Sequence, residues 1–284
     1  MRAVFTYWSQ PITNNPALAT DGYTTSYYEL VSFKLAVMQA KRHFGTTVFY
    51  SDTAGIERFV NQGFIAFDEI HNVYDSLKLY NGNAVPNGLP LVAKLTSIIT
   101  ETLPFIHINS DVFFIRNQTY FNNEAYILNT HDCVVQNVES ITTDFYSNGI
   151  NYINSVFTDT ALLQYSFLPV SGRTAYNCNI IGSVNLTFIQ QFANDALSLL
   201  LGLDYYYLTI PQISVINIMM ERYYIAAKIY SYNISNTPIT LFPYVNNIYD
   251  INELRGLGYV NPTVDAKALE SVCLQIEGTY NKLK

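Results

Sequence analysis

Hydrophobic and polar positions in the first 115 residues follow two alternating periodicities. Short apolar runs rich in β-branched and aromatic residues predict strands, and longer stretches with apolar residues near helical spacing predict helices. The predicted strands span residues 2–8, 46–50 and 64–67, and the predicted helices span residues 25–44, 54–61 and 88–101. Strands that alternate with helices in this way predict a parallel sheet with right-handed crossovers. We therefore expect an α/β fold.

The stretch 104–114, PFIHINSDVFF, is the most informative part of the pattern. Its apolar residues predict a fourth strand, buried on both faces, which Asn109, Ser110 and Asp111 interrupt. Polar groups at the end of a buried strand cost free energy unless they have partners. Since ligands of open α/β sheets bind beyond the carboxyl ends of the strands, we expect these three residues to face a ligand. A strand that ends in an Asx-type turn would contain the same residues.

The second half of the chain has a less regular pattern. The expected elements are strands at 132–139 and 176–183, an extended stretch at 238–243, and helices at 186–201, 212–230 and 264–280. Residues 140–165 predict a helix with a loop that lies over the sheet. No internal repeat or low-complexity linker divides the chain, so we expect a single domain over residues 1–284.

Composition narrows the class of protein. Hydrophobic residues make up 49% of the chain and charged residues 13%, and the formal net charge is −7. An acidic chain gives no electrostatic reason to expect nucleic acid as a partner. Three widely spaced cysteines fit no metal or redox motif, which favours a reducing compartment. Because no apolar run has transmembrane length and no signal sequence is evident, we expect no integral membrane segment and a cytoplasmic location, with peripheral membrane association left open.

The stretch PFIHINSDVFF resembles the Asp-x-Asp region of GT-A-fold glycosyltransferases, in particular bacterial capsular and surface-polysaccharide glycosyltransferase-like proteins. The resemblance implies a GT-A-like (Rossmann-like) fold with a mixed, mainly parallel central sheet flanked by helices. It also implies a nucleotide-sugar donor and a glycan or other hydroxyl acceptor as partners. Residues 1–115 would then form the nucleotide-binding half, residues 116–245 the acceptor-side half, and residues 246–284 a C-terminal helical segment.

In that family the two carboxylates of the motif hold Mn²⁺ or Mg²⁺, which binds the donor diphosphate and neutralises the leaving group. The resemblance therefore implies that Asp111 and Asn109 are metal ligands. Asn109 stands where the first aspartate is usual; its amide oxygen can ligate a metal but brings no negative charge. Residues 256–262, where many members supply a late histidine ligand, contain no histidine. Metal dependence is therefore an open question at this point.

Four further residues match donor-binding positions of the family. Tyr7 and Trp8 end the first strand, where an aromatic ring often stacks on the nucleobase; packing in the core is the other interpretation. Asp52 ends the second strand and matches a carboxylate that contacts base or ribose, although it would also serve to cap the next helix. Lys94 matches a lysine that binds phosphate or sugar, and a solvated helix lysine is the alternative.

Residues 177–183, NCNIIGS, resemble a strand that lines the acceptor side of the same pocket. The candidate acceptor-side residues are Asn177, Asn179 and Gly182, and a glycine there would let a sugar approach the backbone; a glycine in a β-bulge is the other interpretation. Glu221 matches a carboxylate near the sugar site, so Glu221 and Asp111 are the candidate catalytic residues. An ion pair within the helix is the alternative for Glu221.

The sequence thus predicts a glycosyltransferase that moves a sugar from a nucleotide diphosphate-sugar donor to a hydroxyl acceptor, aided by a divalent cation. The alternative is a catalytically inactive glycosyltransferase-like protein that binds a nucleotide or sugar or acts as a scaffold. A Rossmann-type nucleotide-binding enzyme fits less well, because no G-x-G-x-x-G follows the first strand. His107 lies two residues before Asn109 on the same side of the strand and is expected to be a hydrogen-bonded core histidine.

Overall fold

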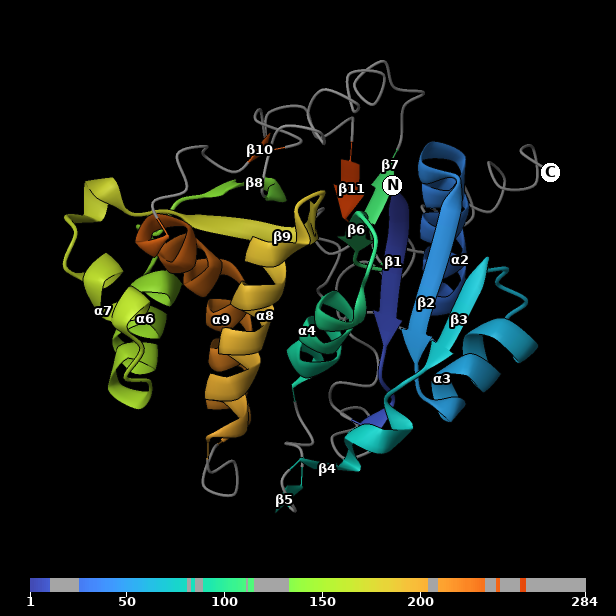
Figure 1. Cartoon of the computed structure of the whole chain (residues 1–284), viewed down its shortest axis with the longest axis horizontal. Helices are drawn as coiled ribbons and strands as arrows, with labels where there is room; N and C mark the ends of the chain where they lie inside the picture. The colour runs from blue at the N-terminus through green and yellow to red at the C-terminus, as the bar shows by residue number, and fades with distance from the viewer. Residues whose placement is uncertain are drawn as a thin grey trace, which may run out of the picture.

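A computed structural model of the chain describes residues 1–10, 26–80, 83–84, 89–110, 112–114, 133–203, 209–232, 239–240 and 251–253 (Figure 1). The strands of its main sheet are β1 (Arg2–Tyr7), β2 (Thr46–Ser51), β3 (Glu69–Asn72), β6 (Phe105–Ile108), β8 (Val134–Glu139), β9 (Ala175–Ser183) and β10 (Ile239–Thr240). They are arranged in the order β10-β8-β9-β6-β1-β2-β3. Strands β3, β2, β1 and β6 are parallel to one another, and β9 is antiparallel to both of its neighbours. The predicted fold class, a mixed and mainly parallel central sheet flanked by helices, is confirmed.

Two short antiparallel pairs lie outside the main sheet. They are β7 (Val112–Phe114) with β11 (Ile251–Glu253), and β4 (Leu79–Tyr80) with β5 (Asn83–Ala84). The described helices are α2 (Ser26–Phe44), α3 (Thr53–Ile56), α4 (Pro90–Thr100), α6 (Asp144–Val156), α7 (Thr160–Ser166), α8 (Leu186–Leu201) and α9 (Ile210–Ser231). A π-helical segment (Glu57–Gln62) continues α3, and two short 3₁₀ turns lie at Asp75–Lys78 and Val170–Gly172.

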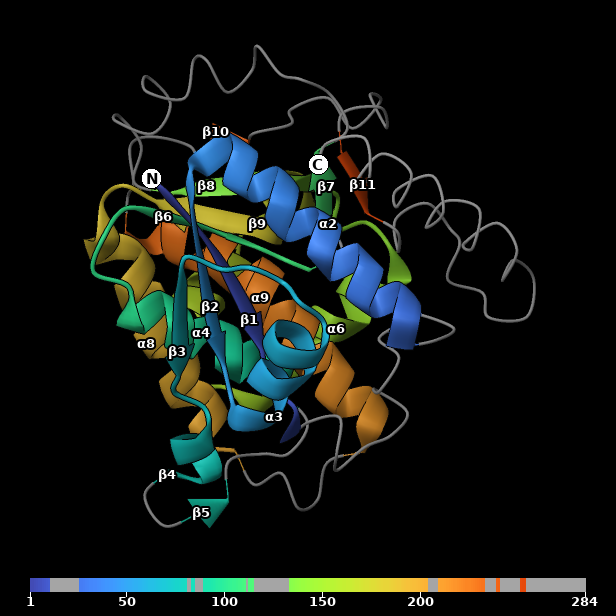
Figure 2. The same ribbon diagram turned by 90° about the vertical axis from the view of Figure 1, so that its right-hand side faces the viewer.

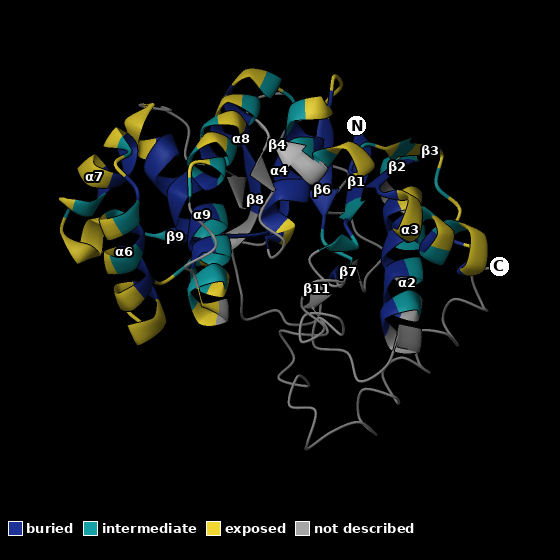
Figure 3. Ribbon diagram, turned by 90° about the horizontal axis from the view of Figure 1, so that it is seen from below, coloured by how far each residue is buried: buried dark blue, intermediate teal, exposed yellow. Residues whose placement is uncertain are grey.

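Successive side chains of the strands point into two separate cores, one on each face of the sheet. Phe5 packs with Phe33 of α2 on one face, whereas Val4 belongs to the larger core that α4, α8 and α9 cover on the other. Figure 2 shows α2 and α3 in front of the sheet, and Figure 3 shows buried strands between helices whose outer surfaces are exposed. Burial on both faces explains why these strands read as nearly continuous apolar runs.

The order of the strands creates a switch point between β1 and β6. From β1 the chain steps outward to β2 and β3, and it then crosses over to β6 on the other side of β1. Connections therefore leave these two neighbouring strands in opposite directions, and ligands of open α/β sheets bind at the carboxyl ends of such a pair of strands. Trp8 follows β1 at this end of the sheet and Asn109 follows β6. The sheet topology thus places Trp8 and Asn109, two of the candidate donor-binding residues, at the carboxyl ends of the strands, where open α/β sheets bind ligands.

The predicted third strand at residues 64–67 is wrong: these residues have no regular structure, and β3 lies at Glu69–Asn72. The apolar residues of the connection serve packing, because Ile65 is 2% exposed and the Phe67 ring stacks on Phe49 with centroids 4.5 Å apart. Phe64 has a positive φ of 54° and is exposed. In contrast, β3 is at the end of the strand order and, among the described residues, pairs with β2 alone, so it needs no apolar run.

The other predicted strands and helices of the described regions are present, with the stretch 140–165 forming α6 and α7 rather than one helix. Asp111, the segment 256–262 and the predicted helix at 264–280 lie outside the described residues. In the part of the chain that the structure describes, no helix is long and apolar enough to cross a membrane.

Candidate functional site

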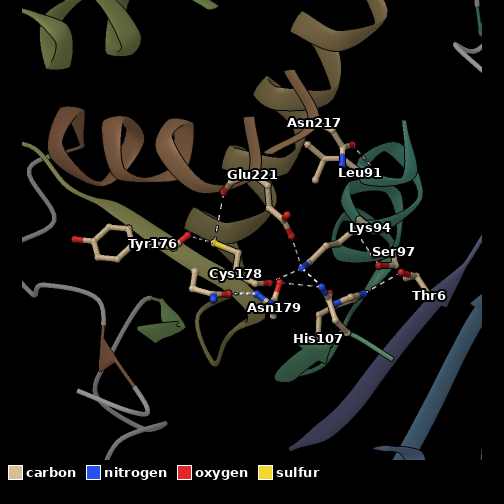
Figure 4. A network of polar contacts seen from close by, with 12 residues as sticks. Thr6, Leu91, Lys94, Ser97, His107, Tyr176, Cys178, Asn179, Asn217 and Glu221 are labelled. Carbon is tan, nitrogen blue, oxygen red and sulfur yellow. Dashed lines mark hydrogen bonds and ion pairs between the residues drawn. The ribbon is translucent and has the colours of Figure 1, made fainter. Parts of the chain in front are cut away.

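Lys94 of α4 is the centre of a polar network at the carboxyl end of β6 (Figure 4). Its ammonium Nζ lies 2.6 Å from Oε1 of Glu221 on α9 and 3.1 Å from Oδ1 of Asn109 at the end of β6. It also donates to the backbone carbonyl of Cys178 on β9. Lys94 is only 6% exposed, so the solvated helix lysine considered from the sequence is not what the structure contains. One ammonium group joins four elements of the fold.

Asn109 and Asn179 continue this network between β6 and β9. The backbone N–H of Asn109 donates to the carbonyl of Asn179 at 2.8 Å, and its side-chain Nδ2 donates to Asn179 Oδ1 at 3.1 Å. An ammonium group can only donate, so the oxygen of the Asn109 amide must face Lys94 and its nitrogen must face Asn179. The orientation of both amides therefore follows from the position of Lys94.

Asn177 stabilises an irregular segment of β9 beside this pair. The pairing of β9 with β8 shifts register between Val135 and Asn137. Inside this segment the backbone N–H of Asn179 donates to Asn177 Oδ1 at 3.0 Å. Bulges of this kind redirect side chains and recur beside functional sites. The three polar residues from the sequence analysis that follow β6 or lie on β9, Asn109, Asn177 and Asn179, are thus brought together.

A side-chain hydrogen bond also joins α4 to α9 one turn away from Glu221. Asn217 lies one turn before Glu221 on α9, and its Oδ1 accepts a hydrogen bond from the backbone N–H of Leu91 at 3.0 Å. Leu89, the residue before α4, offers no side chain that could accept a hydrogen bond from the first N–H groups of the helix. Asn217 supplies that acceptor from α9. Asn217 is not among the residues predicted from the sequence, although its i, i+4 relation to Glu221 places both on one face of the helix.

His107 lies one pleat behind Asn109, and its Nε2 is 3.0 Å from Thr6 Oγ1 on β1. Burial, reinforced by the positive charge of Lys94, holds the pKa of His107 well below its usual value, so the imidazole is neutral. The expectation of a hydrogen-bonded core histidine matches this contact. Cys178 is also buried, and burial with the nearby Glu221 raises the pKa of its thiol well above the usual value, which makes a reactive thiolate unfavourable.

The two aromatic candidates at the end of β1 are packed within the protein. Trp8 is 5% exposed and its ring lies 6.4 Å from that of Tyr74. The hydroxyl of Tyr7 accepts from Arg58 Nη1 at 2.9 Å, and burial raises the pKa of Tyr7 to about 12. The Tyr7 ring packs edge-on against Phe59. These contacts agree with the core interpretation, and stacking on a nucleobase stays a prediction.

Asp52 caps α3 and anchors the chain after β1. Its Oδ1 accepts from the backbone N–H of Gly55 at 2.8 Å, and its Oδ2 accepts from the backbone N–H of Ser9 at 2.9 Å and from the Ser9 hydroxyl. The helix-cap interpretation therefore describes its contacts. Because Asp52 is 3% exposed, the contact with base or ribose stays a prediction.

Gly182 of β9 pairs with Ile106 of β6. A Cβ at this position would be 2.3 Å from the carbonyl oxygen of Phe105 and 2.8 Å from the Cα of Ile106. The space that a side chain would need is thus filled by the backbone of β6 rather than open to a sugar. The packing of β9 against β6 therefore explains the glycine at position 182. Gly182 pairs with Ile106 near the start of β6, whereas Asn177 and Asn179 lie toward the carboxyl end of β6.

Asn109 is the described half of the metal site that the resemblance implies. Lys94 Nζ lies 3.1 Å from Asn109 Oδ1, so the ammonium uses one of the two lone pairs of the oxygen that would ligate the metal. Among the described residues, no group of three or more His, Cys, Asp or Glu side chains is arranged to hold a metal. A divalent cation on this oxygen would lie beside the positive charge of Lys94, and Asn109 as a metal ligand stays a prediction.

The fold and these contacts define a mixed α/β protein with a buried polar network at the switch point of its sheet. The chain belongs to a family of unknown function (DUF6734), whose profile matches residues 1–282. No curated protein sequence matches it. Among solved structures it is similar to the crystal structure of mouse xyloside xylosyltransferase 1 in the apo form, with 11% identity and a TM-score of 0.38 over 78% of this chain and 81% of that chain. That likeness is too distant to indicate an activity.

Proposed function

We propose that the protein is a glycosyltransferase that moves a sugar from a nucleotide diphosphate-sugar donor to a hydroxyl acceptor at the carboxyl ends of β1 and β6. The observation that carries the proposal is the network of Lys94, Asn109, Asn179 and Glu221, which gathers at the switch point of the sheet. Open α/β sheets bind ligands at this position. The resemblance of residues 104–114 to the Asp-x-Asp region adds the reaction class.

Glu221 is the described residue best suited to act on the sugar or its acceptor. A carboxylate can accept a hydroxyl hydrogen as a general base or orient that hydroxyl for attack. Asn109 and Asn179 supply amide groups that suit sugar hydroxyls. We assign no step to a divalent cation; Asp111 and Asn109 as ligands of Mn²⁺ or Mg²⁺ stay a proposal of the resemblance.

Calorimetric titration of the full chain with UDP, GDP and their sugar conjugates tests the proposal. We expect at least one nucleotide-sugar to bind. In a separate turnover assay we expect Glu221→Gln to slow release of the nucleoside diphosphate at least about tenfold, which corresponds to about 1.4 kcal/mol in activation free energy. Each titration is repeated with Mn²⁺ and with EDTA. Absence of binding to every nucleotide and nucleotide-sugar would contradict the proposal, and binding without turnover under any condition would favour the inactive binding protein or scaffold.

A further inference from the structure

All three hydrogens of the Lys94 ammonium are used within the protein. They are donated to Asn109 Oδ1, to the Cys178 carbonyl and to Glu221 Oε1. A phosphate could bind this ammonium only if one of these acceptors lost its hydrogen bond. Both Lys94, 6% exposed, and Cys178, 0% exposed, lie where an unpaired polar group is costly. The contacts of Lys94 are therefore those of a residue that holds other groups in place.

The two carboxylate oxygens of Glu221 have different surroundings. Its Oε1 is bonded to Lys94 at 2.6 Å. Its Oε2 accepts no hydrogen bond from any of the residues that the structure describes, and the side chain is 14% exposed. A carboxylate oxygen is an acceptor only, so a hydroxyl hydrogen suits the free position and a phosphate or second carboxylate does not. Because Lys94 binds Oε1, it leaves Oε2 of Glu221 as the acceptor for a ligand.

The charges of the network cancel. Lys94 and Glu221 form one ion pair, and the other side chains of the network are the uncharged amides Asn109, Asn177 and Asn179. The nearest cation along α9, Arg222, is paired with Glu139 at 2.7 Å. An anionic group that entered would meet the Glu221 carboxylate with no spare hydrogen on Lys94 to offset the repulsion. The network fits an uncharged, hydroxyl-rich ligand.

We propose that Lys94 is a positioning residue for Glu221 and that the free oxygen of Glu221 binds a hydroxyl group of an uncharged sugar ring. This inference rests on the proposed function and names the substrate class of the same site: neutral hexoses or pentoses rather than uronic or other acidic sugars. It also gives Lys94 a role behind the sugar contact, in place of the direct contact with phosphate or sugar that the resemblance implies.

The test compares a nucleotide with its sugar conjugates in four proteins: wild type, Lys94→Met, Glu221→Gln and Lys228→Met. The probes are UDP, UDP-glucose and UDP-glucuronic acid, or GDP, GDP-mannose and GDP-mannuronic acid if guanine is the preferred base. Lys228 is the matched control, because it is another buried lysine, 9% exposed at its side chain, that is paired with a carboxylate, Asp195, at 2.6 Å. It lies on the same helix, seven residues beyond Glu221.

We expect Lys94→Met and Glu221→Gln to leave affinity for the bare nucleotide within about twofold and to weaken binding of the neutral sugar conjugate about tenfold, as loss of a hydrogen bond to a charged group does. Glu221→Gln should also reduce the preference for the neutral over the acidic conjugate. Lys228→Met should change neither ratio. Thermal unfolding of each variant shows that it is folded, and Glu221→Gln, which keeps the shape of the side chain, carries the test if Lys94→Met does not fold.

Weaker binding of the bare nucleotide in Lys94→Met, equal to the loss for the conjugate, would overturn the inference and make Lys94 a phosphate ligand. Equal or tighter binding of the acidic conjugate in the wild type would overturn the choice of neutral sugars. Failure of every nucleotide to bind would remove the proposed function itself and the inference with it, and is distinguishable from both of these results.

Discussion

Asn109 and Asn179 are bonded to each other twice, through the backbone at 2.8 Å and through their side-chain amides at 3.1 Å. The first bond extends the ladder between β6 and β9 by one residue beyond Ile108. The second joins the nitrogen of the Asn109 amide, whose oxygen faces Lys94, to Oδ1 of Asn179. The uncharged pair thereby extends the charged network from β6 to β9.

Replacing Asn109 should therefore disturb both of its neighbours. Asn109→Leu has a similar volume and leaves one hydrogen of Lys94 and the Oδ1 of Asn179 without their present partners. We expect the free energy of unfolding to fall by about 1–3 kcal/mol in urea denaturation. Asn179→Leu and the double variant complete a double-mutant cycle, and strictly additive losses would show that the side-chain bond contributes nothing.

The ion pair of Lys94 and Glu221 predicts a compensating pair of variants. Lys94→Met leaves a carboxylate that is 14% exposed without its cation, and we expect a loss of about 2–4 kcal/mol, below the cost for a fully buried pair. Lys94→Met combined with Glu221→Gln should be more stable than Lys94→Met alone, because no unpaired charge remains. Chemical denaturation at pH 7 measures both, and a double variant less stable than either single variant would exclude this coupling.

Gly182 should not tolerate a methyl group. The Cβ of Gly182→Ala would lie 2.3 Å from the Phe105 carbonyl oxygen, and a backbone atom of a central strand cannot move aside as a side chain can. We expect a loss of about 1–3 kcal/mol or more from overpacking. Gly172→Ala is the control, since its nearest atom, Leu168 Cβ, is 4.0 Å away. Equal unfolding midpoints for the two variants would contradict the close approach of β6 and β9.

The neutral imidazole of His107 predicts a dependence of stability on pH. Burial holds its pKa in the folded protein well below the value of about 6.5 that it has in an unfolded chain. Below that pH the unfolded chain binds a proton that the folded protein does not, so the free energy of unfolding falls as the pH drops. The slope for this single group is at most about 1.4 kcal/mol per pH unit.

His107→Gln removes this proton uptake and can keep a hydrogen bond to Thr6. Urea denaturation at pH 7 and pH 5 should show a smaller loss of stability in His107→Gln than in the wild type. The same loss in both proteins would mean that His107 is protonated in the folded state.

Much of the fold was decided by short-range patterns that the sequence displays. Helix α8 begins and ends at the predicted residues because Asn185 caps it through its bond to the N–H of Thr187 and Gly202 follows it. Strand β3 was not predicted because a strand at the edge of a sheet needs few apolar residues. The apolar residues before β3 belong to the connecting segment, where Phe67 packs on Phe49. The antiparallel direction of β9 depends on partners far away in the chain, so periodicity alone does not contain it.

The candidate site divides in the same way. The resemblance to GT-A-fold glycosyltransferases singled out Lys94, Asn109, Asn179 and Glu221, and the structure joins all four by hydrogen bonds. Their roles were not readable from the sequence, because the acceptors of Lys94 lie 15, 84 and 127 residues away along the chain. Trp8 and Asp52 also stood at the predicted strand ends, but only the packing with Tyr74 and the bonds from Ser9 show how they are used.

The separation of 127 residues between Lys94 and Glu221 has a consequence for biosynthesis. At a translation rate of about 5–20 residues per second, roughly 6–25 s pass between the emergence of the two from the ribosome. Throughout that interval Lys94 on α4 lacks the carboxylate of Glu221, and α9, which buries Lys94 in the folded protein, is also absent. A nascent chain that has completed β6 therefore contains the strands of the switch point but cannot form the network until α9, the last long helix that the structure describes, has been made.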